Sequence, residues 1–215
     1  MAKKKYYAVK KGHEIGIFQD WNTCFKQIHG FKGSIYKGFE TLEEAENYMD
    51  NQIAIQSERY ETEEEVFSKL KEGEMIAYVD GSNLGDGSAF SYASVIFYKK
   101  NGEEIKTSLS GKNSNDTFLS YRNVAGELFA SVKTVDFAVK LGLKKISMYH
   151  DYSGIRHWAL AEWKTRNDLS KYYRKYMEKS LKEINVEFVK TDGHTGDKFN
   201  EEVDKLAKSI LGIKK

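Results

Sequence analysis

Two acidic residues stand where their side chains can reach one point at the edge of a sheet. Asp80 follows the apolar run 75–79, and Asp151 follows a second such run at 145–150. If both runs form parallel neighbouring strands, their carboxyl ends meet at the same edge. Each acid also has a local alternative, because Asp80 can form an Asx-turn with the amides that follow and Asp151 can cap the next helix.

Two further acids lie early in predicted helices. Glu127 falls in the first turns of a helix predicted over 123–141, and Asp204 lies near the start of one over 200–210. Both can instead be surface acids favoured near a helix N-terminus. A cluster of four carboxylates cannot stay ionised unless cations neutralise it, and hard oxygen ligands suit Mg²⁺ or Mn²⁺. Together the four acids predict a site for divalent metal ions.

The elements that must position these acids alternate strands with helices. Strands are predicted over 75–80, 89–98, 104–110, 145–150 and 186–190, and helices over 123–141, 152–162, 169–184 and 200–210. Three successive strands followed by strand–helix alternation are typical of a mixed sheet covered by helices. The expected fold class is therefore α/β, with a five-stranded mixed sheet flanked by helices in a domain over 74–215.

A second, smaller domain is predicted at the N-terminus, over residues 1–49. Its pattern is ββαβα, with strands over 5–10, 14–18 and 34–39 and helices over 21–29 and 41–49. Residues 50–73 are rich in acids and poor in large apolar side chains, so we interpret them as a polar linker, partly helical over 62–71. In that helix Val66, Phe67 and Leu70 form a small apolar face.

Charge is distributed unevenly, although the net charge is only +2. Residues 1–37 hold eight lysines against Glu14 and Asp20, and aromatic residues lie between the lysines. This composition predicts a polyanion partner such as nucleic acid. For Trp21, Tyr36 and Phe39 a place in the core of the small domain is the alternative.

Composition also narrows the class of protein. The single cysteine, Cys24, excludes an internal disulfide framework and is expected to be a small buried side chain. No apolar run reaches the roughly 18 residues that span a membrane, and the first six residues lack the apolar region of a signal peptide. We expect a cytoplasmic monomer that does not associate with membranes.

Residues 75–211 resemble ribonuclease H type 1. The matching blocks, in chain order, are Tyr78-Val79-Asp80-Gly81-Ser82, Asn123-Val124-Ala125-Gly126-Glu127, Tyr149-His150-Asp151-Tyr152 and Gly193-His194-Thr195-Gly196-Asp197-x-x-Asn200-x-x-x-Asp204. The most studied members of the family have serine where this chain has Tyr152. They also often have a basic handle loop where this chain has only the short segment 164–168. The resemblance implies a catalytic domain that cleaves the RNA strand of RNA/DNA hybrids.

The same resemblance implies roles for individual residues. Asp80 would bridge two Mg²⁺ ions, Asp204 would help to hold the ion that activates water, and Glu127 and Asp151 would hold the other, with Mn²⁺ as a possible substitute. His194, in a glycine-flanked loop, would assist proton transfer or product release. Substrate contacts would come from three further positions, Asn123, Gly81 and Ser82, and Asn123 matches a position that contacts 2′-hydroxyls.

Residues 5–49 resemble the hybrid-binding domain of eukaryotic-type ribonuclease H1, also known from viroplasmin. The matching text is Tyr7-Ala8-Val9-Lys10-Lys11-Gly12, Gly16-Ile17-Phe18-x-x-Trp21, Tyr36-Lys37-Gly38-Phe39 and Glu43-Glu44-Ala45. The resemblance implies binding of RNA/DNA hybrid and double-stranded RNA through Tyr7, Trp21, Tyr36 and Lys37, with Trp21 and Tyr36 against the DNA strand and Lys37 at its phosphates. Gly38 stands where a second basic residue is common.

The whole pattern predicts a two-domain hybrid endonuclease that leaves 5′-phosphate and 3′-hydroxyl ends. One alternative is a non-catalytic hybrid-binding protein, which the presence of all four acids disfavours. Another is a nuclease of the same fold that acts on DNA junctions or belongs to a retroelement, which the N-terminal domain disfavours.

Overall fold

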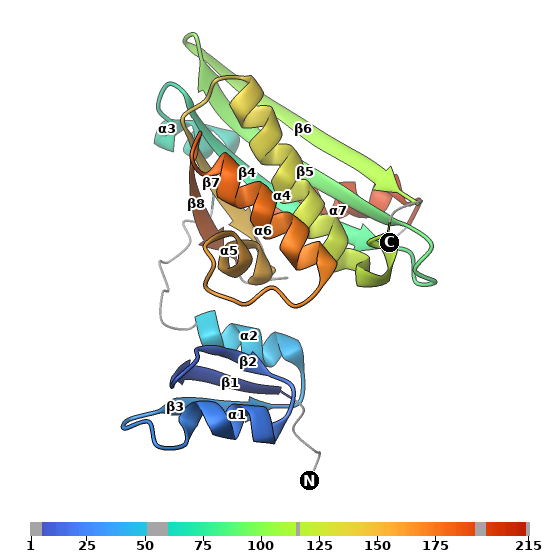
Figure 1. Cartoon of the computed structure of the whole chain (residues 1–215). Coiled ribbons are helices and arrows are strands. Elements are labelled where there is room, and N and C mark those ends of the chain that lie inside the picture. Colours follow the sequence, from blue (N-terminus) through green and yellow to red (C-terminus); the bar gives the residue numbers. More distant parts are fainter. Residues whose placement is uncertain (1–5, 51–59, 115–116, 192–196, 214–215) are drawn as a thin grey trace. The chain divides into compact units, whose positions relative to one another are not determined.

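The structure is a computed structural model that describes residues 6–50, 60–114, 117–191 and 197–213. These residues form two compact units, the first holding the elements β1 to α2 and the second holding α3 to α7 (Figure 1). The mixed α/β architecture and the five-stranded sheet predicted from the sequence are confirmed. Within the described ranges, no helix combines the length and the apolar composition needed to cross a membrane.

The first unit is a three-stranded antiparallel sheet in the order β2-β1-β3, with a helix on each face. Its elements are β1 (Tyr6–Lys11), β2 (Gly16–Phe18), α1 (Trp21–Ile28), β3 (Ile35–Phe39) and α2 (Leu42–Asp50). Alternate residues of β1 point to opposite faces. Val9 packs with Cys24 and Ile28 of α1, whereas Lys10 lies over the ring of Tyr48 in α2. Cys24 is buried, as predicted.

The second unit is built on a sheet in the order β6-β5-β4-β7-β8. Its strands are β4 (Glu74–Asn83), β5 (Phe90–Lys100), β6 (Glu103–Asn113), β7 (Lys145–His150) and β8 (Asn185–Lys190). β4, β5 and β6 are antiparallel, whereas β7 and β8 run parallel to β4. The central strand β4 is buried on both faces, which is why its sequence is almost continuously apolar from Met75 to Val79.

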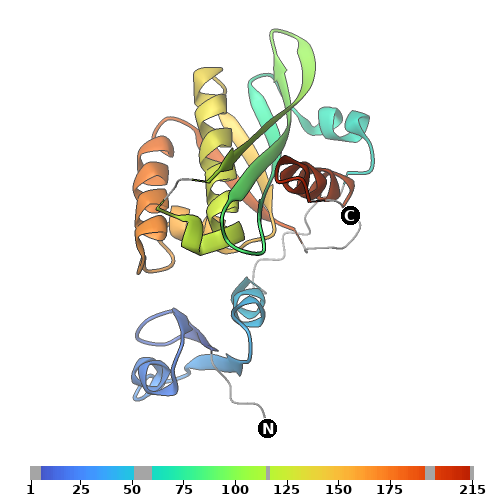
Figure 2. The same cartoon turned by 90° about the vertical axis from the view of Figure 1, so that its right-hand side faces the viewer.

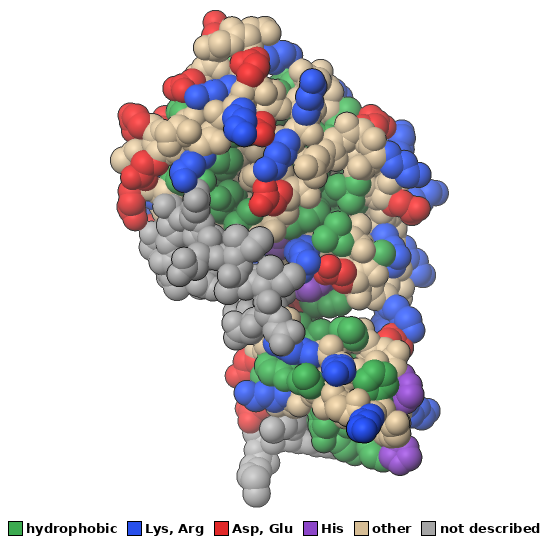
Figure 3. All heavy atoms as spheres, turned by 90° about the vertical axis from the view of Figure 1, so that its left-hand side faces the viewer, with side chains coloured by type: hydrophobic (Ala, Val, Ile, Leu, Met, Phe, Trp, Pro, Cys, Tyr) green, Lys and Arg blue, Asp and Glu red, His purple; other side chains and the backbone are tan. Residues whose placement is uncertain are grey.

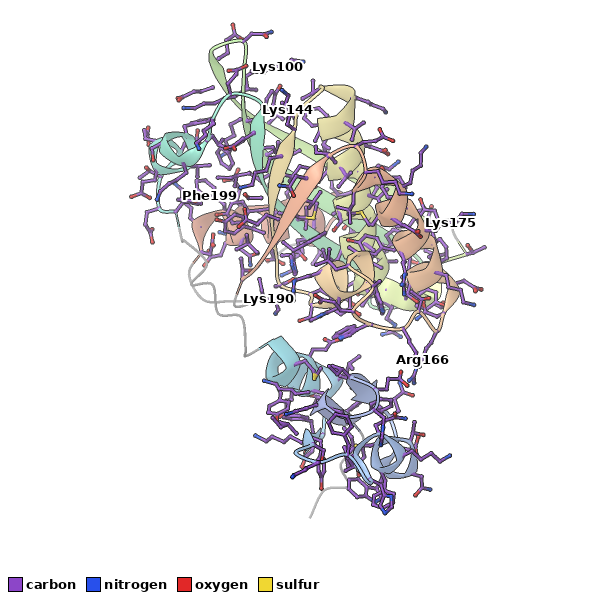
Figure 4. All side chains as sticks on the ribbon, turned by 60° about the vertical axis from the view of Figure 1, so that its left-hand side comes forward. Lys100, Lys144, Arg166, Lys175, Lys190 and Phe199 are labelled. Carbon is purple, nitrogen blue, oxygen red and sulfur yellow. The ribbon has the colours of Figure 1, made fainter. Side chains whose placement is uncertain are left out.

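Helices cover both faces of this sheet, and Figure 2 shows α4 and α6 on one side and α3 and α7 on the other. The helical elements are α3 (Glu63–Lys69), η1 (Leu119–Tyr121), α4 (Arg122–Lys140), α5 (Gly154–Ala159), α6 (Asp168–Ser180) and α7 (Lys198–Ile210). Ala77 and Val79 of β4 pack with α4, while Ile76 and Tyr78 pack with α7. On the α7 side, Phe199, labelled in Figure 4, contacts the rings of Phe97 and Tyr78 at centroid distances of 4.9 and 5.6 Å.

The segment interpreted as a polar linker is ordered at both ends. α2 continues to Asp50, and residues 60–70 pack into the second unit through Tyr60, Val66, Phe67 and Leu70, all of them buried. These four side chains bury enough apolar surface to hold α3 against the sheet. The high acid content of the segment led to its interpretation as a polar linker. The remaining part of the linker, residues 51–59, lies outside the described residues.

A half-exposed lysine holds α3 in place. Lys106 of β6 forms ion pairs with Glu63 of α3 and Glu202 of α7, each with a nitrogen–oxygen distance of 2.9 Å. Its ammonium group also lies 5.4 Å from the ring centroids of Phe97 and Phe199. One acid of this segment and one of the last helix therefore have a structural partner.

Candidate metal centre

Three of the four predicted acids meet at one point. Carboxylate oxygens of Asp80, Glu127 and Asp151 all lie within 4.8 Å of one another. Asp80 lies in β4, Glu127 lies in the second turn of α4, and Asp151 is the residue that follows β7. The structure thus brings together side chains that are separated by up to 71 positions in the sequence, since 151 − 80 = 71.

The parallel register of β4 and β7 places the two aspartates side by side. The last paired residues of the two strands are Tyr78 and Tyr149, and each aspartate lies two positions further on. The sequence predicts that β4 ends at Asp80, and this is wrong. β4 continues to Asn83 because it stays paired with β5, and only its pairing with β7 stops at Tyr78.

A contact between two glycines lets Glu127 approach Asp80. A Cβ atom on Gly81 would lie 2.3 Å from the backbone nitrogen of Glu127, and one on Gly126 would lie 2.1 Å from the carbonyl oxygen of Ser91 and 2.8 Å from the Cα of Gly81. Side chains at these two positions would hold α4 away from β4. The glycines of two sequence blocks therefore serve one function, which is to bring the start of a helix against a strand.

Glu127 is nearly fully buried, and Asn123 lies beside it. Glu127 is 4% exposed. The Nδ2 atom of Asn123, one turn earlier on α4, donates a hydrogen bond of 3.3 Å to its Oε1 atom. A buried carboxylate is costly without such neighbours or a cation. Asn123 is exposed, so it lies at the border between the buried acid and solvent.

Burial and the neighbouring acids together raise the pKa of Asp80. Burial raises the pKa of its carboxyl group, the neighbouring Asp151 and Asp204 raise it further, and the pKa reaches about 8. A hydrogen bond of 2.7 Å from the backbone nitrogen of Gly81 opposes this rise, as does the charge of Lys208. The protein therefore holds Asp80 where its ionised form needs a positive partner.

Asp204, the fourth acid, stands slightly apart from this group. It lies on α7, where its carboxylate forms an ion pair with Lys208 one turn later, at 2.7 Å. Its charge contributes to the raised pKa of Asp80, so it lies close to the same centre. The sequence analysis missed Lys208, although spacing of i and i+4 on a helix is the signal that pairs it with Asp204.

The arrangement fits a divalent cation by its donor set and its unbalanced charge. Three carboxylates offer hard oxygen ligands from rigid elements, and a nearby fourth can join them.

Lys190 is, after Lys208, the second lysine near the acids that was not predicted from the sequence. It ends β8, where Figure 4 labels it, and its Nζ atom donates to the carbonyl oxygen of Asp151 at 2.6 Å. This bond holds the loop that carries Asp151 without occupying its carboxylate.

The remaining predicted residues of the second unit have mixed outcomes. Ser82 is buried in β4 beside Gly81, and Tyr152 packs against Trp158 at a centroid distance of 5.9 Å. His194 lies outside the described residues. α5 and α6 are joined by residues 160–167 alone, so no long handle lies between them, as the sequence predicted.

On the first unit, three of the predicted aromatic residues form one cluster, in which Trp21 and Tyr36 are exposed and Tyr7 is half-buried. The ring of Trp21 lies 5.4 Å from that of Tyr7 and 5.8 Å from that of Tyr36. Trp21 is 42% exposed, so it is a surface residue and not part of the small core. Lys37 is not in this cluster, because its side chain points to the α2 face and its Nζ atom lies 5.7 Å from the ring of Tyr48.

Comparisons with known proteins agree with this division of the chain. Residues 5–49 match the family described as the ribonuclease H1 N-terminal domain, and residues 72–211 match the family described as RNase H. Ribonuclease H of Schizosaccharomyces pombe is 23% identical over 96% of this chain and 97% of its own length. Ribonuclease H1 of Homo sapiens is 22% identical over 94% of this chain and 88% of its own length.

Other relatives match one part of the chain. Ribonuclease H of Saccharomyces cerevisiae is 46% identical over 44 residues, which are 20% of this chain and 13% of that protein. The crystal structure of ribonuclease H1 from Halobacterium salinarum has a TM-score of 0.53 and 18% identity, and the match covers 65% of this chain and 98% of that one. This likeness shows the fold.

Replacing Asp80 should stabilise the protein in the absence of metal. The folded pKa of about 8 lies above the ordinary value, so the ionised carboxylate destabilises the fold increasingly as pH rises from about 4 to 8. Asp80→Asn should raise the free energy of unfolding at pH 8 in EDTA by at least about 1.4 kcal/mol, the equivalent of one pKa unit. Denaturant unfolding at several pH values measures this gain, which should vanish near pH 4. A less stable variant at pH 8 would contradict the assigned repulsion.

Adding a side chain at the contact between Gly81 and Gly126 should weaken cation binding. Gly126→Ala places a methyl group against Ser91 and Gly81, so α4 must move and carry Glu127 away from Asp80. We expect the affinity for Mn²⁺, measured by isothermal titration calorimetry, to fall at least about tenfold with little change in circular dichroism. Gly85→Ala is the matched control, because nothing lies within 4 Å of a Cβ atom there. Equal affinities for the two variants would show that the contact does not set the site.

Proposed function

The chain belongs to the ribonuclease H family, and we propose that it is an endonuclease that hydrolyses the RNA strand of RNA/DNA hybrids. The observation that carries this proposal is the meeting of Asp80, Glu127 and Asp151 at one point beside Asp204. The human and fission-yeast relatives are named ribonuclease H1 and ribonuclease H, and both align over most of their length. The first unit, which matches the N-terminal domain family, would bind the same hybrid or double-stranded RNA.

In this proposal the four acids hold divalent cations, Mg²⁺ or Mn²⁺, against the scissile phosphate. Asp80 is central, since its carboxylate neighbours both Asp151 and Asp204 and would contact two ions. Glu127 and Asp151 complete one side, and Asp204 completes the other. When bound, such ions stabilise the attacking and leaving oxygens of an in-line displacement. Attack by water with departure of the 3′-oxygen leaves 5′-phosphate and 3′-hydroxyl ends.

Other residues would position the RNA strand and move protons. Asn123 is exposed next to Glu127, where its amide can contact a 2′-hydroxyl, the group that distinguishes RNA from DNA. Gly81 and Ser82 would contribute backbone contacts beside it. His194 would take part in proton transfer or product release.

Cleavage of matched duplexes tests the activity and its dependence on the acid cluster. With Mg²⁺, the protein should cut the RNA strand of a labelled hybrid and leave duplex DNA, duplex RNA and single strands of the same sequence intact. Asp151→Asn should lower kcat at least about a hundredfold, because it removes charge from the centre without removing volume.

Asp86→Asn is the matched control, since Asp86 is an exposed acid in a turn and Asn can keep its bonds to Ser88. It should retain the parent rate. A hybrid that is bound but never cut would identify a non-catalytic binding protein, and an Asp151→Asn variant as active as the parent would remove the cluster from the mechanism.

A further inference from the structure

The exposed aromatic cluster of the first unit continues beyond Trp21 along α1. The ring of Phe25 lies 5.9 Å from that of Trp21 and 4.8 Å from that of His29, one turn further on. Tyr36, Trp21, Phe25 and His29 therefore form a continuous row of rings, which we call the ring row. Of these four residues, only Tyr36 and Trp21 are predicted from the sequence to have a function.

Phe25 does not contribute to the core of its unit. The inner face of α1 presents Cys24 and Ile28, which are buried with Val9 and Phe18. Phe25 is 43% exposed, as much as Trp21 and Tyr36 are. Exposing a large apolar ring gains nothing from the hydrophobic effect, and contiguous exposed apolar side chains mark binding surfaces.

The surroundings of the ring row suit a polyanion. α1 contains Lys26 and no acid, although the exposed Asp20 caps its start. Lys11 at the end of β1 and Lys32, which follows α1, are also exposed. Figure 3 shows apolar and lysine side chains sharing the surface of the first unit. Flat rings among lysines are the combination by which proteins contact the sugars and bases of a nucleic-acid strand while neutralising its phosphates.

We propose that Phe25 is a further binding position for the DNA strand of the hybrid, beyond the one at Trp21. This inference rests on the proposed function of the first unit and specifies its contact. Each strand rises about 3.4 Å per nucleotide. Rings whose centroids are 5.9 Å apart can therefore contact neighbouring nucleotides of one strand. Phe25 lengthens the contact and does not duplicate that of Trp21.

The chemistry of the ring selects DNA over RNA at this position. A phenyl ring has no hydrogen-bonding group. Packing it on a ribose would bury the 2′-hydroxyl without a partner, whereas deoxyribose presents no such group. Phe25 therefore determines specificity, because it favours a hybrid over double-stranded RNA.

Binding measurements with the full chain test this assignment. The background carries Asp80→Asn so that the substrate is not cut, and fluorescence anisotropy compares labelled RNA/DNA hybrid with double-stranded RNA of the same sequence. Phe25→Ala should raise the Kd for hybrid about fivefold to tenfold and the Kd for double-stranded RNA less than twofold. Leu42→Ala is the matched control, because Leu42 is 39% exposed but lies on α2 at the other face of the sheet.

A second variant separates lost contact from lost folding. Phe25→Lys keeps a good helix former at an exposed position, and circular dichroism monitors its fold. It should lose the preference for hybrid while the slope of log Kd against log salt concentration increases by about one, since one more phosphate is neutralised.

The outcomes distinguish this inference from the proposed function. If Phe25→Ala binds hybrid as Leu42→Ala does while Trp21→Ala binds it more weakly, hybrid binding by the first unit stands and the position at Phe25 is refuted. Equal losses for hybrid and double-stranded RNA would refute the selection of DNA. If Trp21→Ala also binds like the parent, the first unit does not bind hybrid through this surface, and both claims fail.

Discussion

The catalytic domain depends on the contact between Gly81 of β4 and Gly126 of α4. Neither residue can carry a side chain without a clash with backbone atoms, so strand and helix approach as closely as two backbones can. That approach brings Glu127 against Asp80. The pKa of Asp80 is raised to about 8, first by burial and then by the charges of Asp151 and Asp204. The ionised form of Asp80 therefore destabilises the fold. The hydrophobic cores around it must supply the free energy that offsets this cost.

The rest of the second unit provides that support from both faces of the sheet. The parallel pairing of β4 with β7 fixes Asp80 and Asp151 at equal height, and α4 packs over this pair through its buried face. On the other face Phe199 anchors α7, which carries Asp204, and Lys106 ties α7 to α3. Each acid is therefore held by an element with its own buried anchor, as preorganised charge stabilisation requires.

The sequence predicted the elements well, because apolar strands and helices with apolar stripes are local patterns. Three of the four acids that it singled out lie together in the structure. The sequence could not give the end of β4, since the continuation past Asp80 depends on pairing with β5, a contact between distant residues. Nor could it give the packing of Tyr60 and α3, or the approach of Lys190 to Asp151. Phe25 was missed because a helix pattern alone does not tell an exposed ring from a buried one.

The central claim is that this glycine contact assembles a centre for divalent cations from acids on three elements. Crystals grown with Mn²⁺ and measured at a wavelength where manganese scatters anomalously test it directly. The account predicts an anomalous peak within about 2.5 Å of carboxylate oxygens of Asp80 and Asp151, with Glu127 or Asp204 nearby. A well-ordered structure at saturating Mn²⁺ in which these oxygens have no such peak would contradict it.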